Sequence, residues 1–491
     1  MDLKSDNGYL RSIFNKITYR DLIIFLIPFI IYMFYLYVYN PGIIRVDAFN
    51  QLHQIATSTF ANWHPFFHTF IEMMCLKVYP NPISIGIFQI VIFSGIWTAI
   101  CNYFRHNEKS KDFILQVIFT LIIALIPVNA IFSITYLKDT LFSYFLLLTC
   151  FLIKVLVDRK GDVGLGFIVI FSLAMACVAQ IRPNGMIIII VLLAVLFIYL
   201  FRKNRPRKTY VLIPAVTIIF ILLIASLNVV YDVEDNQKDA VLTKVVHMLA
   251  DYDLNLNLES SDRDKIHMLF NESTIKKNYE PTFSDSIYHA TNRTAYNNDK
   301  FTYISMAIEY SLKNPGHFVK YLFKSSPMTW DIVRDDSWHG VSYITNTNRE
   351  GHQFYTNYNM TPASTYDNAT FKDNESGLFK ALNSMANFIK KDKLLDTLFE
   401  SPALYMYLSL ILVGTIYVLT KSKGILLVYL PNLLNILTIF VSTPTQDSRY
   451  LYPNLLVFYL LVIILIGILT RPKDPEAEIR AKVLKELKQE R

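Results

Sequence analysis

Two acidic positions carry the residue types from which this chain could build a catalytic site: Asp47, and Asp139 beside Lys138. Asp47 closely follows an apolar stretch, and a carboxylate at a membrane edge is partly desolvated, which raises its pKa toward neutrality and suits it to accept a proton. The alternative is an ordinary acid at the start of a short helix that runs on through Phe49 and Leu52. Lys138 and Asp139 could likewise begin a helix. They could also pair a phosphate-binding cation with an acid that orients an acceptor.

Two further clusters each place one arginine among polar residues: Arg182 in an Arg-Pro-Asn-Gly turn and Arg449 in a Gln-Asp-Ser-Arg-Tyr segment. Arginine suits phosphate because its planar guanidinium donates two parallel hydrogen bonds. We expect these clusters to form one anion site, with Asp47 and Asp139 as its catalytic residues. The expected substrate-binding residues are Gln51, Trp63, His64, Lys138, Arg182, Asn184, Asp447, Arg449 and Tyr450.

The clusters lie between long apolar segments. Of the 491 residues, 53% are hydrophobic and 18% charged, and segments of about 18–23 apolar residues recur, enough to cross a hydrocarbon core of ~30 Å. The sequence predicts an all-α polytopic membrane protein with about ten transmembrane helices. Their expected positions are 22–39, 83–104, 113–132, 140–157, 164–180, 186–201, 209–231, 402–420, 425–441 and 453–470.

Basic residues alternate between the short loops. One set of loops is strongly basic, which by the positive-inside rule predicts that it is cytoplasmic, whereas the loops with the polar clusters lie outside the cell. The net charge of +7 then reports orientation and attraction to anionic lipid, not nucleic-acid binding. The basic set is Lys4, Arg11, Lys16, Arg20, Arg105, Lys109, Lys111, Lys154, Arg159, Lys160, Arg202, Lys203, Arg205, Arg207, Lys208, Lys421 and Lys423.

One short segment decides this topology. Residues 65–80 are apolar but contain His68, Glu72 and Lys77, so we expect a juxtamembrane helix in the outer interface. The second exterior region is long enough for a small, mainly helical domain, with helices expected at 239–255 and 302–324 and a break at Pro315. The expected divisions are a cytoplasmic N-terminus (1–21), a seven-span membrane module (22–231) with its first exterior loop at 40–82, an exterior domain (232–400), three C-terminal spans (401–470) and a charged cytoplasmic tail (471–491).

Several other sequence features limit the kinds of segment, bond and cofactor that we expect. The first span lacks a small-residue cleavage site and is typical of a signal anchor. All four cysteines fall in apolar segments and no Cys/His metal spacing or P-loop occurs, so disulfides, a metal site and ATP-driven chemistry are not expected. Five Asn-x-Ser/Thr sequons in the exterior region are more readily explained by its high asparagine content than by glycosylation. They begin at Asn271, Asn292, Asn359, Asn368 and Asn374.

The order of these motifs resembles the C-type glycosyltransferase (GT-C) superfamily of membrane enzymes. Its members place an Asp in the first exterior loop, an interfacial helix after a His-Pro or similar sequence, an acidic residue after the third span, and an Arg-Tyr-x-x-Pro element before a late span. The matching positions here are Asp47, His64-Pro65, Lys138-Asp139 and Arg449-Tyr450-Leu451-Tyr452-Pro453. The Arg-Pro-Asn-Gly turn and Lys-Asn-Pro-Gly-His at 313–317 further resemble a poorly characterised bacterial and archaeal branch of these proteins. It departs from many relatives in having Ala48, not a second acid, after Asp47.

The resemblance implies an inverting transfer of a sugar from a polyprenyl-phosphate donor to an acceptor of the cell envelope outside the membrane. Asp47 would be the general base, and Lys138, Arg182 and Arg449 would bind the phosphate and stabilise it as leaving group. Asp139 would orient the acceptor or a basic partner. The implied partners are the lipid-linked donor, an extracytoplasmic acceptor that is a glycan, lipid or protein, and membrane lipids. A divalent cation, Mg²⁺ or Mn²⁺, is expected only if the donor is a pyrophosphate.

Other classes of function stay open from the residues alone. A lipid-linked glycan polymerase or ligase would also use exterior arginines. A transporter or flippase should place charges near mid-span and often shows inverted repeats, whereas these polar clusters lie at the mouths of the spans. A scaffold or sensor built on residues 232–400 would leave Asp47 and the Lys138–Asp139 pair without a role.

Overall fold

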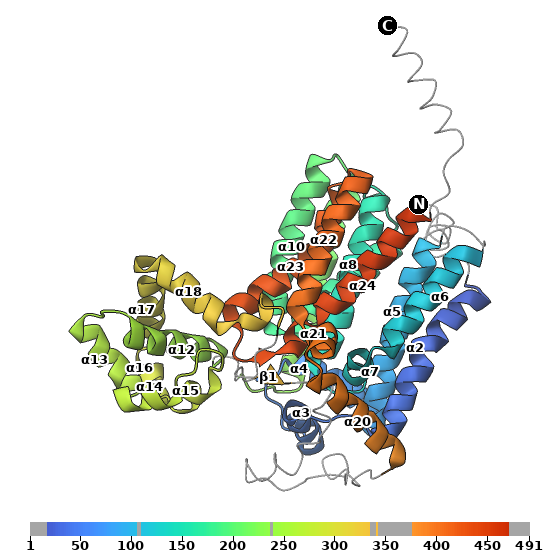
Figure 1. Cartoon of the computed structure of the whole chain (residues 1–491). Coiled ribbons are helices and arrows are strands. Elements are labelled where there is room, and N and C mark those ends of the chain that lie inside the picture. The colour runs from blue at the N-terminus through green and yellow to red at the C-terminus, as the bar shows by residue number, and fades with distance from the viewer. Residues whose placement is uncertain (1–16, 106–109, 236–238, 334–339, 342–375, 471–491) are drawn as a thin grey trace.

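The computed structural model describes residues 17–105, 110–235, 239–333, 340–341 and 376–470. Within these ranges the secondary structure is almost entirely helical, apart from a short parallel pair of strands, β1 (Gly340–Val341) and β2 (Gln446–Asp447). The bundle of long helices and a group of shorter ones beside it are seen in Figure 1.

Among the described residues, eight helices are long and apolar enough to cross a membrane. The chain is therefore an all-α multi-pass membrane protein, as the sequence predicts. The most buried are α8, with 78% of its apolar window buried, and the span formed by η2 (Ser448–Leu451) and α24 (Tyr452–Leu469), with 72% buried. The other six are α2 (Tyr19–Val38), α5 (Ile83–Phe104), α10 (Pro183–Arg202), α11 (Arg207–Val230), α22 (Pro402–Thr420) and α23 (Gly424–Ser442), and α8 itself is Lys138–Asp158.

The segment expected as one straight span at 113–132 is broken. Helix α6 (Ser110–Leu125) and helix α7 (Pro127–Ser133) meet at an angle of 71°. Proline lacks a backbone N–H and pushes the preceding residue out of the helical region, so the chain turns at Pro127. The helix expected at 164–180 is α9 (Leu165–Ile181), which is apolar but only 17 residues long.

The first polar region after α2 folds into two short helices, α3 (Val46–Thr57) and α4 (Phe66–Val78). At 13 residues, α4 is well short of the ~20 needed to span a bilayer. Both helices lie at one end of the spans, together with α7, α20 (Gly377–Lys391) and α21 (Lys393–Glu400) (Figure 1). This end is called the polar end below.

The opposite end of the bundle carries the basic loops. There the start of α2 meets the end of α5 through an ion pair between Asp21 and Arg105 of 2.8 Å, and the ends of α5 and α8 meet where Tyr103 donates to Asp158. The segregation of basic loops to one end and polar clusters to the other matches the predicted alternation. The described basic residues of these loops are Arg20, Arg105, Lys111, Lys154, Arg159, Lys160, Arg202, Lys203, Arg205, Arg207, Lys208, Lys421 and Lys423.

Beside the polar end stands a separate helical body with its own core, built around Leu249, Tyr252 and Tyr310. The predicted helices at 239–255 and 302–324 are present, and the second is divided at Pro315 because proline occupies its first helical position. We call this body the helical domain. Its helices are α12 (Asp239–Asn255), α13 (Ser260–Leu269), α14 (Glu272–Asn278), α15 (Asp285–His289), α16 (Arg293–Asn298), α17 (Lys300–Lys313) and α18 (Pro315–Ser325).

The helical domain is tied to the bundle through the loop between α23 and α24. The side chain of Gln446 donates to the carbonyls of Thr282 and Ser325, at 3.1 and 3.0 Å, and accepts from the backbone N–H of Met328. Ser284 adds a backbone bond of 2.8 Å to Pro444. This loop is consequently held from the domain side immediately before Arg449.

Two of the sequons have a structural role. Asn271 and Asn292 are the N-cap residues of α14 and α16, and each side-chain oxygen accepts a backbone N–H three residues on. The sequons at Asn359, Asn368 and Asn374 lie outside the described residues. So do most of residues 335–376, the tail 471–491 and the first sixteen residues.

Candidate functional site

Asp47 lies in the first turn of α3, where three side chains from distant parts of the chain surround its carboxylate. Its Oδ2 is 3.0 Å from Nη1 of Arg449 and 3.3 Å from Nζ of Lys138. Its Oδ1 is 3.9 Å from Nε2 of His64. A helix-start role alone does not account for this arrangement, because the carboxylate binds two cations.

The backbone brings Asp47 to Lys138. The strand-like segment after α2 pairs with the segment before α8, where Ile43 donates to the carbonyl of Ile134 and accepts from Tyr136. Tyr136 also donates its hydroxyl to the carbonyl of Pro41. These bonds hold the start of α3 against the start of α8. Asp47 and Lys138 therefore meet although they are 91 residues apart in sequence.

The pKa of Asp47 differs from the sequence-based expectation. Burial raises it, as predicted, but the charges of Arg449 and Lys138, with the hydrogen bond from Lys138, outweigh burial and hold the pKa well below its usual range. Asp47 is therefore fully ionised at neutral pH, and the expectation of a pKa raised toward neutrality was wrong. With its side chain 25% exposed, it is the most accessible acid of the cluster.

His64 is neutral at physiological pH. Burial, and then the nearby Lys138 charge, lower its pKa to about 4. Lys138 can only donate, so its 3.1 Å contact makes Nδ1 of His64 the acceptor and places the ring proton on Nε2, on the Asp47 side. The imidazole thus presents an N–H toward the carboxylate.

Arg449 links the acids of the cluster. Besides Asp47, its Nε is 2.9 Å from Oδ2 of Asp447 and 3.7 Å from Oδ2 of Asp139. Its Nη2 donates to the hydroxyl of Tyr450, over whose ring the guanidinium lies at 5.0 Å. Only a planar, multiply donating cation can make this set of contacts.

Arg182 forms the deeper part of the cluster. It pairs with Asp139 at 3.1 Å and its guanidinium lies between the rings of Phe142 and Tyr450, at 5.1 and 4.9 Å. The tight α9–α10 turn that carries it depends on Gly185, where a Cβ would come within 1.9 Å of a carbonyl oxygen of α9. Asp139, with a side chain 1% exposed, is almost fully buried.

The charges of the cluster balance. Three carboxylates and three cations are interleaved at the starts of α3, α8, α10 and the η2–α24 span, so four helix N-termini, each with a partial positive charge, lie at this cluster. We call this set the charged cluster. Its members are Asp47, Lys138, Asp139, Arg182, Asp447 and Arg449.

Two of the expected substrate-binding residues also join helices to one another. Gln51 is buried, donates to Thr69 and contacts His68, so it joins α3 to α4. Asn184 donates to Asn435 and Thr438 and so holds α10 against α23. Their role in substrate binding stays a prediction.

Trp63 lies at the rim of the cluster, one residue before His64, and is 44% exposed. Its ring stacks at 6.4 Å on Tyr288 of α15, a helix that sequence analysis did not connect with the site. Burial raises the pKa of the neighbouring Asp285, and the charges of Asp47 and Arg449 both act on it. Since α15 is about 240 residues from Asp47 in sequence, no local pattern signals this approach.

A second pair of polar side chains lies on the buried face of α4. His68 and Glu72 are fully buried, with Nδ1 and Oε1 3.7 Å apart. Burial lowers the pKa of His68 to about 3 and raises that of Glu72 well above its usual range, so burial favours the neutral form of both side chains. They were noted in the sequence only as polar residues that disfavour a span.

The described residues offer no group of three or more His, Cys, Asp or Glu side chains around a common point that could hold a metal ion. The acids of the charged cluster each contact a lysine or arginine instead. The expectation of a Mg²⁺ or Mn²⁺ ion for a pyrophosphate donor stays a prediction.

Residues 82–482 match the family of unknown function DUF6020. The chain belongs to the DUF6020 family. No curated protein and no solved structure matches it. The part matched by DUF6020 includes Lys138, Asp139, Arg182 and Arg449 but begins after Asp47 and His64.

Proposed function

We propose that this DUF6020 protein is a membrane glycosyltransferase of the GT-C type, which moves a sugar from a polyprenyl-phosphate donor to an acceptor outside the cytoplasm. The observation that carries the proposal is the joining of Asp47 to Lys138 and Arg449 at the polar end of the bundle. An accessible carboxylate beside cations and helix N-termini suits a reaction in which a phosphate leaves while a hydroxyl loses its proton.

The proposed topology has ten crossings, made of the eight long helices, the bent pair α6–α7 and the shorter α9. Both termini are then cytoplasmic, with the basic loops, and the charged cluster and the helical domain are exterior. A lipid-linked donor fits this sidedness, because nucleotide sugars are not available outside the cell.

Donor phosphate binds at Lys138 and Arg449, with Arg182 behind them. An incoming phosphate must share the cations that Asp47 now contacts at 3.0 and 3.3 Å. Each cation shared with phosphate is a weaker partner for Asp47, so the pKa of Asp47 rises as the donor binds. The base is therefore weak without donor and becomes stronger with it.

In the transfer step the acceptor oxygen forms a bond to the anomeric carbon as the bond from that carbon to the phosphate oxygen breaks. The acceptor proton passes to Asp47, and the electron pair leaves with polyprenyl phosphate, whose charge Arg449 and Lys138 stabilise. The exposed Trp63 and the nearby Asp285 on α15 form the acceptor side, where an aromatic face and a carboxylate suit a sugar.

The test uses purified full-length protein in lipid nanodiscs, a radiolabelled polyprenyl-phosphate sugar and a membrane extract that contains acceptor. Asp47→Asn should keep its fold and lose transfer by about 10²–10⁴-fold. The matched control is Asp264→Asn, at an exposed acid on α13, which should transfer like the wild type. Unchanged transfer in Asp47→Asn would reject the assignment. Consumption of a lipid-pyrophosphate glycan, with no use of monophosphate donors, would favour a polymerase or ligase instead.

A further inference from the structure

Helix α17 has apolar side chains on two faces. Its inner face packs into the helical domain through residues such as Met306 and Tyr310, each 5% exposed. Its outer face carries Phe301, Ile308 and Leu312, which are 73%, 54% and 76% exposed. A helix on the surface of a domain in water normally has a polar outer face, so a second apolar surrounding is expected here.

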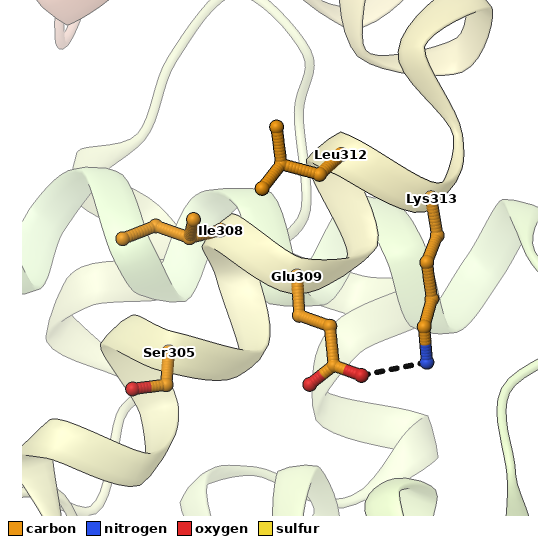
Figure 2. A pocket seen from close by; sticks show the side chains of 5 residues that line it. All are labelled: Ser305, Ile308, Glu309, Leu312 and Lys313. Atoms are coloured by element: carbon orange, nitrogen blue, oxygen red, sulfur yellow. Dashed lines mark ion pairs between the residues drawn. The ribbon is translucent and has the colours of Figure 1, made fainter.

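The arrangement of this outer face is seen in Figure 2. Ile308 and Leu312 project away from the ion pair between Glu309 and Lys313, whose atoms are 2.6 Å apart. With Ser305, these residues line a shallow hollow of about 500 Å³. The helix thus presents an apolar strip edged by charged groups.

The next helix, α18, also exposes apolar side chains and contacts the membrane bundle. Val319 and Phe323 of α18 are 50% and 45% exposed, and Phe323 packs on Phe440 of α23 with ring centroids 5.2 Å apart. On α23 the neighbouring Leu437 and Val441 are 50% and 48% exposed, as expected for side chains that face lipid. The apolar face of the domain is therefore continuous with the lipid-facing surface of the spans.

Charge and placement agree with this continuity. Lys320 and Lys324 on α18 are exposed and lie beside the apolar strip, where ammonium groups can reach lipid headgroups. In Figure 1, α17 and α18 lie on the side of the helical domain that points toward the basic end of the bundle, and α14, α15 and α16 lie on the opposite side.

We propose that α17 and α18 together form a membrane-binding surface, with Ile308, Leu312, Val319 and Phe323 immersed at the boundary between headgroups and acyl chains. Amphipathic helices of this kind lie in the interfacial plane with the apolar face ~5–10 Å deep. The helical domain is then held to the bilayer at a site separate from its attachment to the bundle through Gln446. This inference does not depend on the proposed glycosyltransferase activity.

The test places a fluorophore of the NBD type on Leu312→Cys in full-length protein reconstituted into nanodiscs. The four native cysteines are all buried, so labelling is directed to the new one. The matched control is Lys276→Cys, at an exposed position on α14. Emission is measured with aqueous iodide as one quencher and lipids brominated on their acyl chains as the other.

At position 312 we expect quenching by brominated lipid and an iodide quenching constant at least about threefold lower than at position 276. A second variant, Leu312→Cys combined with Ile308→Glu, should regain iodide access because a carboxylate at the strip opposes insertion. Equal iodide quenching at 312 and 276 would overturn the proposal. So would a label at 312 that is protected from both quenchers while the protein cross-links into dimers, because a second copy would then cover this face.

Discussion

Replacing Asp47 with asparagine should tighten the binding of a prenyl phosphate while it removes sugar transfer. Asp47 accepts contacts from both Lys138 and Arg449, so it competes with the phosphate for the same cations. Asparagine has nearly the same shape and keeps a carbonyl oxygen, but it has no negative charge. The two effects therefore have opposite signs, which a merely misfolded variant cannot produce.

The size of the binding effect follows from the two contacts. A hydrogen bond to a charged group contributes about 1.5–3 kcal/mol when buried. Asp47 is 25% exposed, and solvent screening therefore reduces the free energy of each contact to ~1 kcal/mol. Phosphate binding to the wild type displaces part of both contacts, so the variant should gain roughly 1–2 kcal/mol, or about 5–30-fold in Kd.

The assay is calorimetric titration of farnesyl phosphate into the wild type, Asp47→Asn and the control Asp264→Asn in the same detergent. The thermal unfolding midpoint of each protein is recorded alongside, to show that the variant is folded. A Kd for Asp47→Asn equal to or weaker than that of the wild type would refute the competition between Asp47 and phosphate. Tighter binding together with retained transfer would instead leave the cation site in place and remove Asp47 as the base.

Three further predictions concern other parts of the molecule. Arg449→Lys should weaken farnesyl phosphate binding by about tenfold, because a single ammonium cannot replace the multiple contacts of the guanidinium; wild-type affinity in titration would contradict this. Glu72→Gln should raise the unfolding midpoint, and more so as pH rises above ~4.5. Because the folded protein raises the pKa of Glu72, the wild type loses stability as the pH rises from the unfolded to the folded pKa. A difference in unfolding midpoint between variant and wild type that does not change with pH, measured by thermal scanning, would argue against a protonated Glu72. In intact cells, a membrane-impermeant thiol reagent should label Lys276→Cys but not Arg205→Cys; the reverse pattern would invert the proposed topology.

Much of the architecture could be predicted from the sequence because long apolar segments and basic loops are local signals. The placement of the polar clusters at one end followed from the alternation of Lys and Arg, and the short α4 followed from the polar residues inside it. The break at Pro127 was missed because apolar composition continues on both sides of it, so hydropathy alone could not show the turn.

The electrostatics of the site could not be predicted in the same way. Burial at a membrane edge suggested a raised pKa for Asp47, but the cations that lower it lie 91 and 402 residues away in sequence. Their convergence is a property of the packed bundle. Gln51 and Asn184 are close in sequence to charged residues of the site, yet their side-chain amides donate to α4 and α23. Residue type alone does not show which acceptor an amide will contact in the fold.

The loop between α23 and α24 also couples two parts of the protein. Gln446 donates two hydrogen bonds to the helical domain and accepts a third from Met328, just after α18. Arg449, three residues on, contacts the acids of the charged cluster. A displacement of the domain against the bundle must therefore be absorbed within this short segment or passed to the guanidinium. Thermodynamic linkage makes such coupling reciprocal. A ligand that fixes Arg449 would also restrain the domain. Substrate occupancy should therefore change the amide hydrogen exchange of Ser284 and Met328, whose N–H groups donate to Pro444 and Gln446 of this loop.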